Sequence, residues 1–283
     1  GTFLINDADA SFVNSTDGTW NYSGTGHDAS TVLTCSASPN TFNYNAAGNQ
    51  QMILVVGADY HHLGIVTSGT KTPLTGYVMD IEGDLTISGN AIFDVDAQNN
   101  NITIAGNWIN SAAVGFGFTE GTESVTFDGA SAQSVSCSTI LTETFHNLLV
   151  NKAAGATDAD KTLTLSNHVA LTSAGIVTFS GNGYISLSGK NFTVTDWDGT
   201  DIASYDSDEF FIVDNVGFIK YTGVDAGEVV NIPMGGGADA ARYALAELTM
   251  TNAGAGTLDA NMCTQVQLDG GCSGAAVASD AVN

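Results

Sequence analysis

The sequence predicts an all-β protein, built as a parallel β-solenoid stacked on a smaller C-terminal module that resembles a β-sandwich. Period-2 runs rich in Val, Ile, Thr and Phe recur along the chain, Ser-Gly, Gly-Asn and Asn-Asn turns separate them, and helix signals are nearly absent. Between about residues 75 and 200 the strands are short and regularly spaced, which suits coils that stack on one another. A β-sandwich is the competing interpretation, because regular strands with turn signals suit it too.

The chain also repeats itself about once every 85 residues. The matched segments are 41–44 with 126–129, 60–63 with 145–148, 83–89 with 169–175, and 102–108 with 192–197. The first two pairs are offset by 85 residues, and the offset drifts to 89 downstream. Because one module of short strands cannot bury its own apolar face, a long period indicates stacked modules. We therefore expect a solenoid over residues 1–204 with two repeats, about 41–125 and 126–204.

The composition and strand pattern of the sequence change after residue 204. Residues 205–209 form a charged, turn-like break, and the strands predicted beyond it at 210–213 and 217–221 are richer in large side chains. We therefore predict a separate sandwich-like module over residues 205–283.

Charge restricts the possible partners. Thirty acidic residues against six basic ones give a formal net charge of -24, which repels phosphate backbones and anionic lipid. No stretch reaches the roughly 20 apolar residues that a membrane helix needs. Nucleic-acid binding and membrane insertion are therefore not expected, and saline or calcium-containing surroundings would supply the counter-charge. The chain begins at Gly1 rather than Met, which indicates a removed signal peptide or a segment of a longer polypeptide.

Three sequence elements in a fixed order carry a family resemblance. They are IAGNW at 104–108, VTFDGASAQSV at 125–135 and FHNL at 145–148. This order resembles the repeats of large secreted surface proteins of Bacteroidetes-type bacteria, which are usually interpreted as β-helical adhesins. NIPMG at 231–235, followed by LTMTNAG at 248–254, is similar to the module that accompanies those repeats. The resemblance covers roughly residues 41 to 283 and implies structural repeats, with no catalytic residues to carry over.

Closely spaced acids raise the question of calcium, which needs six to eight oxygen ligands. The best cluster is Asp196, Asp198 and Asp201, where side chains and turn carbonyls can supply several oxygens. It lacks the 12-residue EF-hand spacing. We expect a calcium site there, with solvated turn acids as the alternative.

The four cysteines form no zinc-binding pattern. Cys263 and Cys272 flank a turn at 269–271, so a hairpin can bring them within bridging distance. We expect a disulfide between them, and consider a second between Cys35 and Cys137. Buried free thiols are the alternative.

Two other residue types have both a functional and a structural interpretation. Histidines 61, 62 and 146 can bind metal, but their recurrence in the two repeats indicates a structural place. Tryptophans 20, 108 and 197 can stack on sugars, but two of them recur at the repeat ends, which favours core packing.

No nucleophile elbow, phosphate loop or HExxH helix is present, and a uronate lyase would need more basic residues. We therefore predict a non-enzymatic structural subunit or segment of an extracellular, cell-surface fibre or adhesin, with itself as the main partner. A secreted carbohydrate-binding or carbohydrate-active β-helix protein, with surface polysaccharide as its partner, is the alternative. Exposed aromatics would favour the alternative; buried tryptophans and an uncovered sheet edge would favour the fibre.

Assembly is predicted at the strand edges, because unpaired edges are templates for a second chain. Residues 1–6, with Phe3, Leu4 and Ile5 as the contact residues, would complete a sheet in a neighbouring subunit. The alternative is that Phe3 and Ile5 cap their own solenoid.

Overall fold

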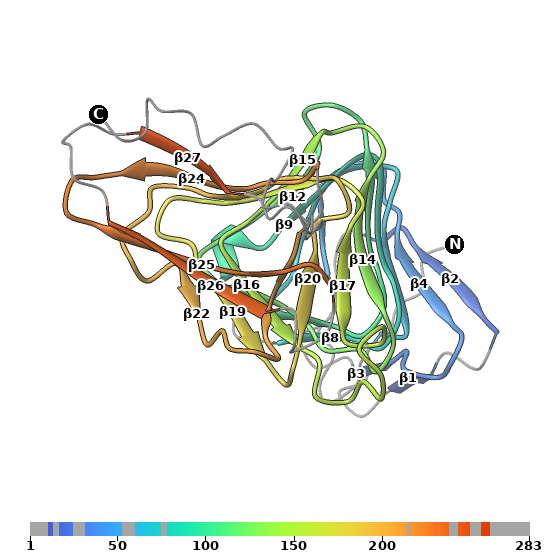
Figure 1. The fold of residues 1–283 in the computed structure, drawn as a ribbon. Helices are drawn as coiled ribbons and strands as arrows, with labels where there is room; N and C mark the ends of the chain where they lie inside the picture. The colour runs from blue at the N-terminus through green and yellow to red at the C-terminus, as the bar shows by residue number, and fades with distance from the viewer. Residues whose placement is uncertain are drawn as a thin grey trace.

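The computed structural model describes residues 11–13, 17–24, 32–52, 60–74, 78–213, 216–237, 243–249 and 256–260. It confirms the predicted all-β parallel solenoid, with about eight turns (Figure 1). In the described part, the one helical element is a short 3-10 helix, η1 (Asp96–Gln98). No helix among these residues is long and apolar enough to cross a membrane.

Each coil visits three faces in turn, which we number in chain order. Face 1 is the main path of the largest sheet. Its neighbouring strands all pair in parallel, except the last two, which are antiparallel. Its strands are β2 (Thr19–Tyr22), β4 (Thr41–Tyr44), β6 (His62–Ile65), β9 (Leu85–Asp94), β11 (Trp108–Ala112), β14 (Gln133–Cys137), β17 (Thr162–Leu165), β20 (Tyr184–Ser186), β23 (Phe210–Ile212), β25 (Val229–Gly235) and β26 (Tyr243–Thr249).

Faces 2 and 3 complete the coil. Face 2 holds β5 (Gln50–Gln51), β7 (Ser68–Thr72), the second half of β9 and β12 (Gly117–Thr119), and then β15 (Thr142–Phe145), β18 (His168–Leu171), β21 (Phe192–Val194), β24 (Ile219–Val224) and β27 (Gly256–Ala260). Face 3 holds β8 (Met79–Ile81), β10 (Ile102–Ile104), β13 (Ser124–Phe127), β16 (Asn147–Asn151), β19 (Val177–Ser180) and β22 (Ile202–Ala203). β1 (Ser11–Val13) and β3 (Val32–Thr34) pair separately.

The alternation of residues explains why these segments stack. β11 and β14 both alternate buried and half-buried positions, so every second side chain enters the interior. On face 1 the buried residues of successive coils lie in register, and Leu63, Leu85, Trp108 and Val135 form one such column, each at most 1% exposed. Burying a large apolar side chain contributes about 1.5–3 kcal/mol. The core is therefore a set of columns that runs along the solenoid.

The 85-residue sequence repeat does not return the chain to the same face. Thr41–Tyr44 lies on face 1, whereas its match at 126–127 lies in β13 on face 3. Likewise Leu63 lies on face 1 and Leu148 on face 3. The structural repeat is the shorter coil, in which Leu85, Trp108 and Val135 are successive register partners. Segments that match in the sequence repeat therefore lie on different faces of the solenoid.

The parallel pairing of the coils continues past the predicted boundary near residue 204. β23 pairs in parallel with β20, and β24 pairs in parallel with β21, so the solenoid continues through the charged segment. That segment is a corner, closed by an antiparallel bridge between Asp206 and Glu209. The pattern changes only where β26 and β27 add antiparallel to β25 and β24. Residues 261–283 of the proposed module lie outside the described residues.

Candidate functional site

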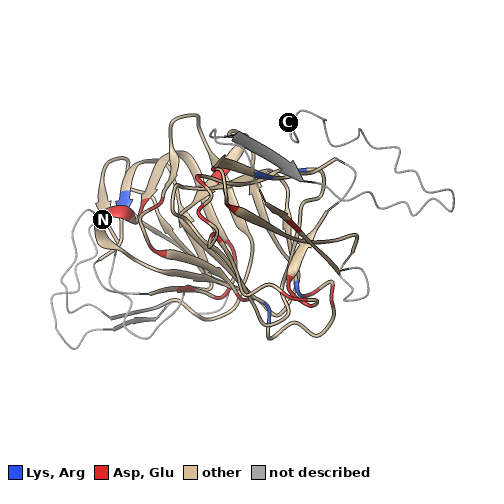
Figure 2. Cartoon of the chain, turned by 60° about the vertical axis from the view of Figure 1, so that its left-hand side comes forward, with Lys and Arg blue, Asp and Glu red and all other residues tan. Residues whose placement is uncertain are grey.

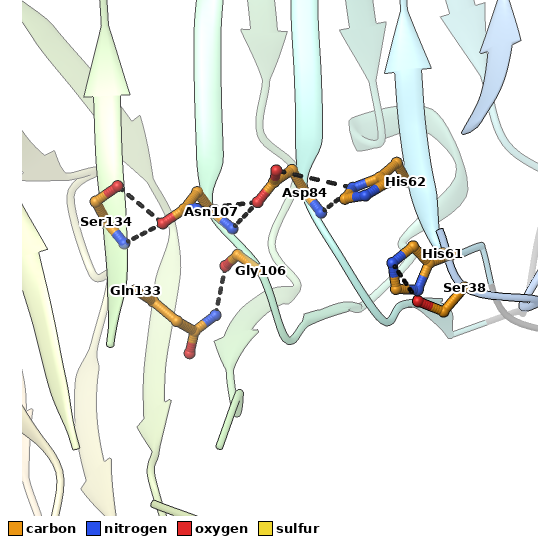
Figure 3. A network of polar contacts seen from close by, with 8 residues as sticks. All are labelled: Ser38, His61, His62, Asp84, Gly106, Asn107, Gln133 and Ser134. Carbon is orange, nitrogen blue, oxygen red and sulfur yellow. Dashed lines mark hydrogen bonds and ion pairs between the residues drawn. The ribbon is translucent and has the colours of Figure 1, made fainter. Parts of the chain in front are cut away.

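Polar side chains gather at the corner where each coil passes from face 3 to face 1. His62 begins β6, Asp84 and Asn107 immediately precede β9 and β11, and Ser134 lies in β14. Because Leu63, Leu85, Trp108 and Val135 are register partners, the residues that precede them stack on one another. We call these four residues the polar column; Figure 3 shows them side by side.

Three side chains of the polar column, His62, Asp84 and Asn107, each accept a hydrogen bond from the backbone of the next coil. The Asp84 N–H donates to His62 Nδ1 at 2.9 Å, the Asn107 N–H to Asp84 Oδ1 at 2.7 Å, and the Ser134 N–H to Asn107 Oδ1 at 2.9 Å (Figure 3). These side chains therefore satisfy backbone N–H groups at the corner, where a strand partner would otherwise be missing. The column fastens coil to coil.

The same device recurs at the other corners. The Asn191 N–H donates to His168 Nδ1 at 2.9 Å, and the Phe218 N–H donates to Asn191 Oδ1 at 3.2 Å. The Ile176 N–H donates to Asn147 Oδ1 at 3.1 Å. Asn, Asp and His are interchangeable here because each offers an acceptor close to the backbone.

His61, His62 and a serine lie together, but not as a hydrolytic triad. Ser38 Oγ is 3.4 Å from His61 Nε2, while the Asp84 carboxylate is 3.7 Å from Nδ1 of the other imidazole, His62. The two rings are 4.4 Å apart and nearly perpendicular, at 78°. A triad needs one imidazole between the hydroxyl and the carboxylate. Burial and the neighbouring His62 lower the pKa of His61. The third predicted histidine, His146, contacts Thr172 Oγ1 through Nδ1 at 2.6 Å.

A second device, which we call the corner clamp, occurs twice. In the first clamp Gln50 donates from Nε2 to the carbonyls of Tyr22 and Gly24, at 2.8 and 2.7 Å, on the preceding coil. From the next coil Lys71 donates from Nζ to the carbonyls of Ala46, Gly48 and Ser68, at 2.7, 2.9 and 2.6 Å. Gln50 is 3% exposed and Lys71 0%.

In the second clamp, Gln133 Nε2 donates to the carbonyls of Ile104 and Gly106, at 2.8 and 2.6 Å. Lys152 Nζ donates to the carbonyls of Gly129 and Ser131, at 2.6 and 2.8 Å, and to Gln133 Oε1 at 2.8 Å. Lys152 is fully buried, and burial lowers its pKa to about 8. The sequence analysis missed both clamps, although Gln50 and Gln133 lie 83 residues apart, close to the period of the repeat.

A buried acid lies on face 2. Glu143 Oε2 accepts hydrogen bonds from Asn110 Nδ2 at 2.9 Å and Cys137 Sγ at 3.1 Å. All three residues are buried, and burial raises the pKa of the Glu143 carboxyl. It also raises the pKa of the Cys137 thiol, which makes this sulfur a poor nucleophile.

The predicted calcium residues make hydrogen bonds, two of them within the turn at 198–201 and one to the preceding coil. Asp201 Oδ2 accepts the Asp198 N–H at 2.8 Å, Asp198 Oδ1 accepts the Thr200 N–H at 2.9 Å, and Asp196 Oδ2 accepts the Ser173 hydroxyl at 2.9 Å. Across the part of the chain that the structure describes, no group of three acidic, histidine or cysteine side chains is placed to hold a metal ion. The carboxylates shape the turn, and the geometry lends calcium no support.

Acidic residues are spread along the coils, and basic residues are few (Figure 2).

Trp108 and Trp197 are 0% and 2% exposed, which places these two tryptophans in the core; Trp20 is half-buried. Trp108 and Trp197 therefore offer no flat surface for a sugar.

Cys35 and Cys137 are both free and buried, which corrects the bridge considered between them. Cys35 bridges in parallel to Tyr60, whereas Cys137 ends β14 on face 1 several coils away. Cys263, Cys272, Phe3, Leu4 and Ile5 lie outside the described residues. Their disulfide and assembly roles stay predictions.

Comparisons with known proteins add no identity. No family model matches the chain. No curated protein and no solved structure matches it either.

Proposed function

We propose that this chain is a non-enzymatic structural segment of an extracellular fibre or adhesin at a cell surface. One observation carries the proposal: the polar side chains at the corners, which a catalytic or binding site would use, are committed to the backbone of neighbouring coils. Asp84, Asn107 and Asn191 each accept an N–H from the next coil. A protein whose polar groups fasten its own coils is suited to stiffness and length.

The burial of the aromatic residues supports the same proposal over carbohydrate binding. Trp108 packs edge-on against Phe145 at 5.1 Å, and Trp197 against Tyr221 at 5.2 Å. Both indoles are buried, so neither presents a ring face on which a sugar could stack. The acidic surface also keeps such a segment soluble at high local concentration.

An exposed strand at the end of face 1 supports assembly through strand edges. β26 is the last strand of that face and pairs antiparallel with β25. Leu245 and Leu248 on it are 47% and 42% exposed, and the strand carries no lysine or proline to discourage pairing.

Electron microscopy of the purified protein over a range of concentrations, together with light scattering, tests this proposal. We expect end-to-end oligomers or filaments, and fewer of them when Leu248→Lys places a charge on β26. Val114→Lys, at an exposed apolar position outside β26, is the matched control. Monomers at every concentration, together with binding to a polysaccharide array, would favour the carbohydrate-binding alternative instead.

A further inference from the structure

The second corner clamp brings an amine and a carboxamide together in a buried setting. Lys152 Nζ lies 2.8 Å from Gln133 Oε1, and the two residues are 0% and 2% exposed. We propose that Lys152 and Gln133 form an intramolecular isopeptide bond, a covalent cross-link between two coils of the solenoid. In the structure the two side chains are hydrogen-bonded, which is the arrangement that precedes such a reaction.

The electrophile is already held in place on both sides. Gln133 Nε2 donates to the carbonyls of Ile104 and Gly106, which fixes the plane of the amide. Its Oε1 accepts the Gly129 N–H at 2.9 Å. A backbone N–H on this oxygen stabilises the negative charge that develops there when an amine attacks the carbon.

The nucleophile needs to lose a proton and to be shielded from water. Burial lowers the pKa of Lys152 to about 8, so the neutral amine becomes accessible in mildly alkaline solution. A side chain added at Gly183 would come within 3.1 Å of Lys152 Cγ, which shows how closely the next coil covers the lysine. Exclusion of water favours attack by the amine over hydrolysis.

The reaction balances without an outside reagent. In mildly alkaline solution the lysine ammonium loses one proton to solvent, and the neutral amine attacks Cδ of Gln133. The bond between Cδ and Nε2 breaks, the new bond between Cδ and Nζ remains, and the departing nitrogen takes one proton from the attacking amine. The products are the cross-linked amide and one ammonia.

The first clamp provides a control within the same chain. Lys71 Nζ contacts the Ser68 carbonyl at 2.6 Å in place of a glutamine side chain. The first clamp therefore has a buried lysine and a buried glutamine, but not the direct contact between them. We expect it to stay unlinked.

Mass spectrometry of the intact, purified chain after incubation at mildly alkaline pH tests the proposal. We expect a mass lower by one ammonia than the sequence requires, and a branched peptide that joins Gln133 to Lys152 after digestion. Lys152→Met should keep the full mass, while Lys71→Met should still lose ammonia. Circular dichroism checks that each variant is folded.

Peptide mapping of the unmutated chain decides the matter even where a variant fails to fold. If the chain still has the full mass that its sequence requires after prolonged incubation, the proposal is overturned. So would ammonia loss that maps to a succinimide at the Asn182-Gly183 sequence, with both clamp peptides unlinked.

Discussion

The two corner clamps are built from the same residues on different faces. The first joins coils between β4 on face 1 and β5 on face 2, and the second between β13 on face 3 and β14 on face 1. In both, a buried glutamine reaches back to two carbonyls of the previous coil, and a buried lysine reaches in from the next coil. The comparison teaches that the sequence repeat encodes a corner rather than a face.

The clamps differ in one contact, and this difference sets their expected strengths. Lys71 ends on the Ser68 carbonyl of its own coil, whereas Lys152 ends on Gln133 Oε1. Lys152 therefore positions the glutamine that holds the preceding coil, so three coils depend on a single ammonium group. Lys71 bonds only to backbone carbonyls.

The largest effect is expected for Lys152→Met, which keeps the apolar stem and leaves buried oxygens without donors. Unsatisfied buried polar groups cost about 1–3 kcal/mol each, so we expect a loss of about 3–5 kcal/mol in the free energy of unfolding. Lys71→Met should cost less. Urea denaturation measures both, with Lys190→Met, at a half-buried position, as the control expected to change stability by less than about 0.5 kcal/mol. Equal effects at all three lysines would break the comparison.

The glutamines come next in expected size. Gln133→Leu and Gln50→Leu each remove the donor of two carbonyl bonds, and each should lower stability by about 2–3 kcal/mol. Because Gln133 also holds Lys152, its loss should not add to that of Lys152→Met, whereas Gln50→Leu and Lys152→Met should add. A double-mutant cycle measures this; additivity in the first pair would show that the contact at 2.8 Å contributes nothing.

Glu143 extends the comparison from buried lysines to a buried acid. Burial raises its pKa in the folded state, so its contribution to stability is complete below the unfolded pKa and is lost as pH rises through the folded one. Glu143→Gln keeps an acceptor for Asn110 and carries no charge. We expect the melting temperature of the unmutated protein to fall as pH rises from mildly acidic to neutral, and that of Glu143→Gln to fall less. Parallel pH profiles would refute this explanation.

The smallest effects are expected in the polar column. His62→Asn keeps an acceptor for the Asp84 N–H and should change stability by under about 0.5 kcal/mol, whereas His62→Leu should cost about 1 kcal/mol. The same difference is expected at His168, whose Nδ1 accepts the Asn191 N–H: His168→Asn should be mild and His168→Leu more damaging. Chemical denaturation separates the two classes; a more damaging Asn than Leu substitution would mean that the imidazole itself is required.

The sequence predicted the solenoid because alternation and turn residues are local. Strands such as β10 and β21 lie where the period-2 runs at 102–104 and 192–194 place them. The boundary predicted near residue 204 falls at a corner of the solenoid, and a charged tight turn looks the same in sequence whether it ends a domain or closes a corner. The clamps escaped notice because Lys152 and Gln133 meet only through coil register, which depends on loop lengths that the sequence does not reveal.

Hydrogen exchange followed by mass spectrometry, comparing the unmutated chain with Lys152→Met, tests most directly the claim that corner side chains fasten neighbouring coils. We predict faster exchange confined to the coils that the clamp joins, around β10, β13 and β16, with β21 and β24 unchanged. Exchange that is unaltered, or that rises equally along the whole solenoid, would contradict the claim.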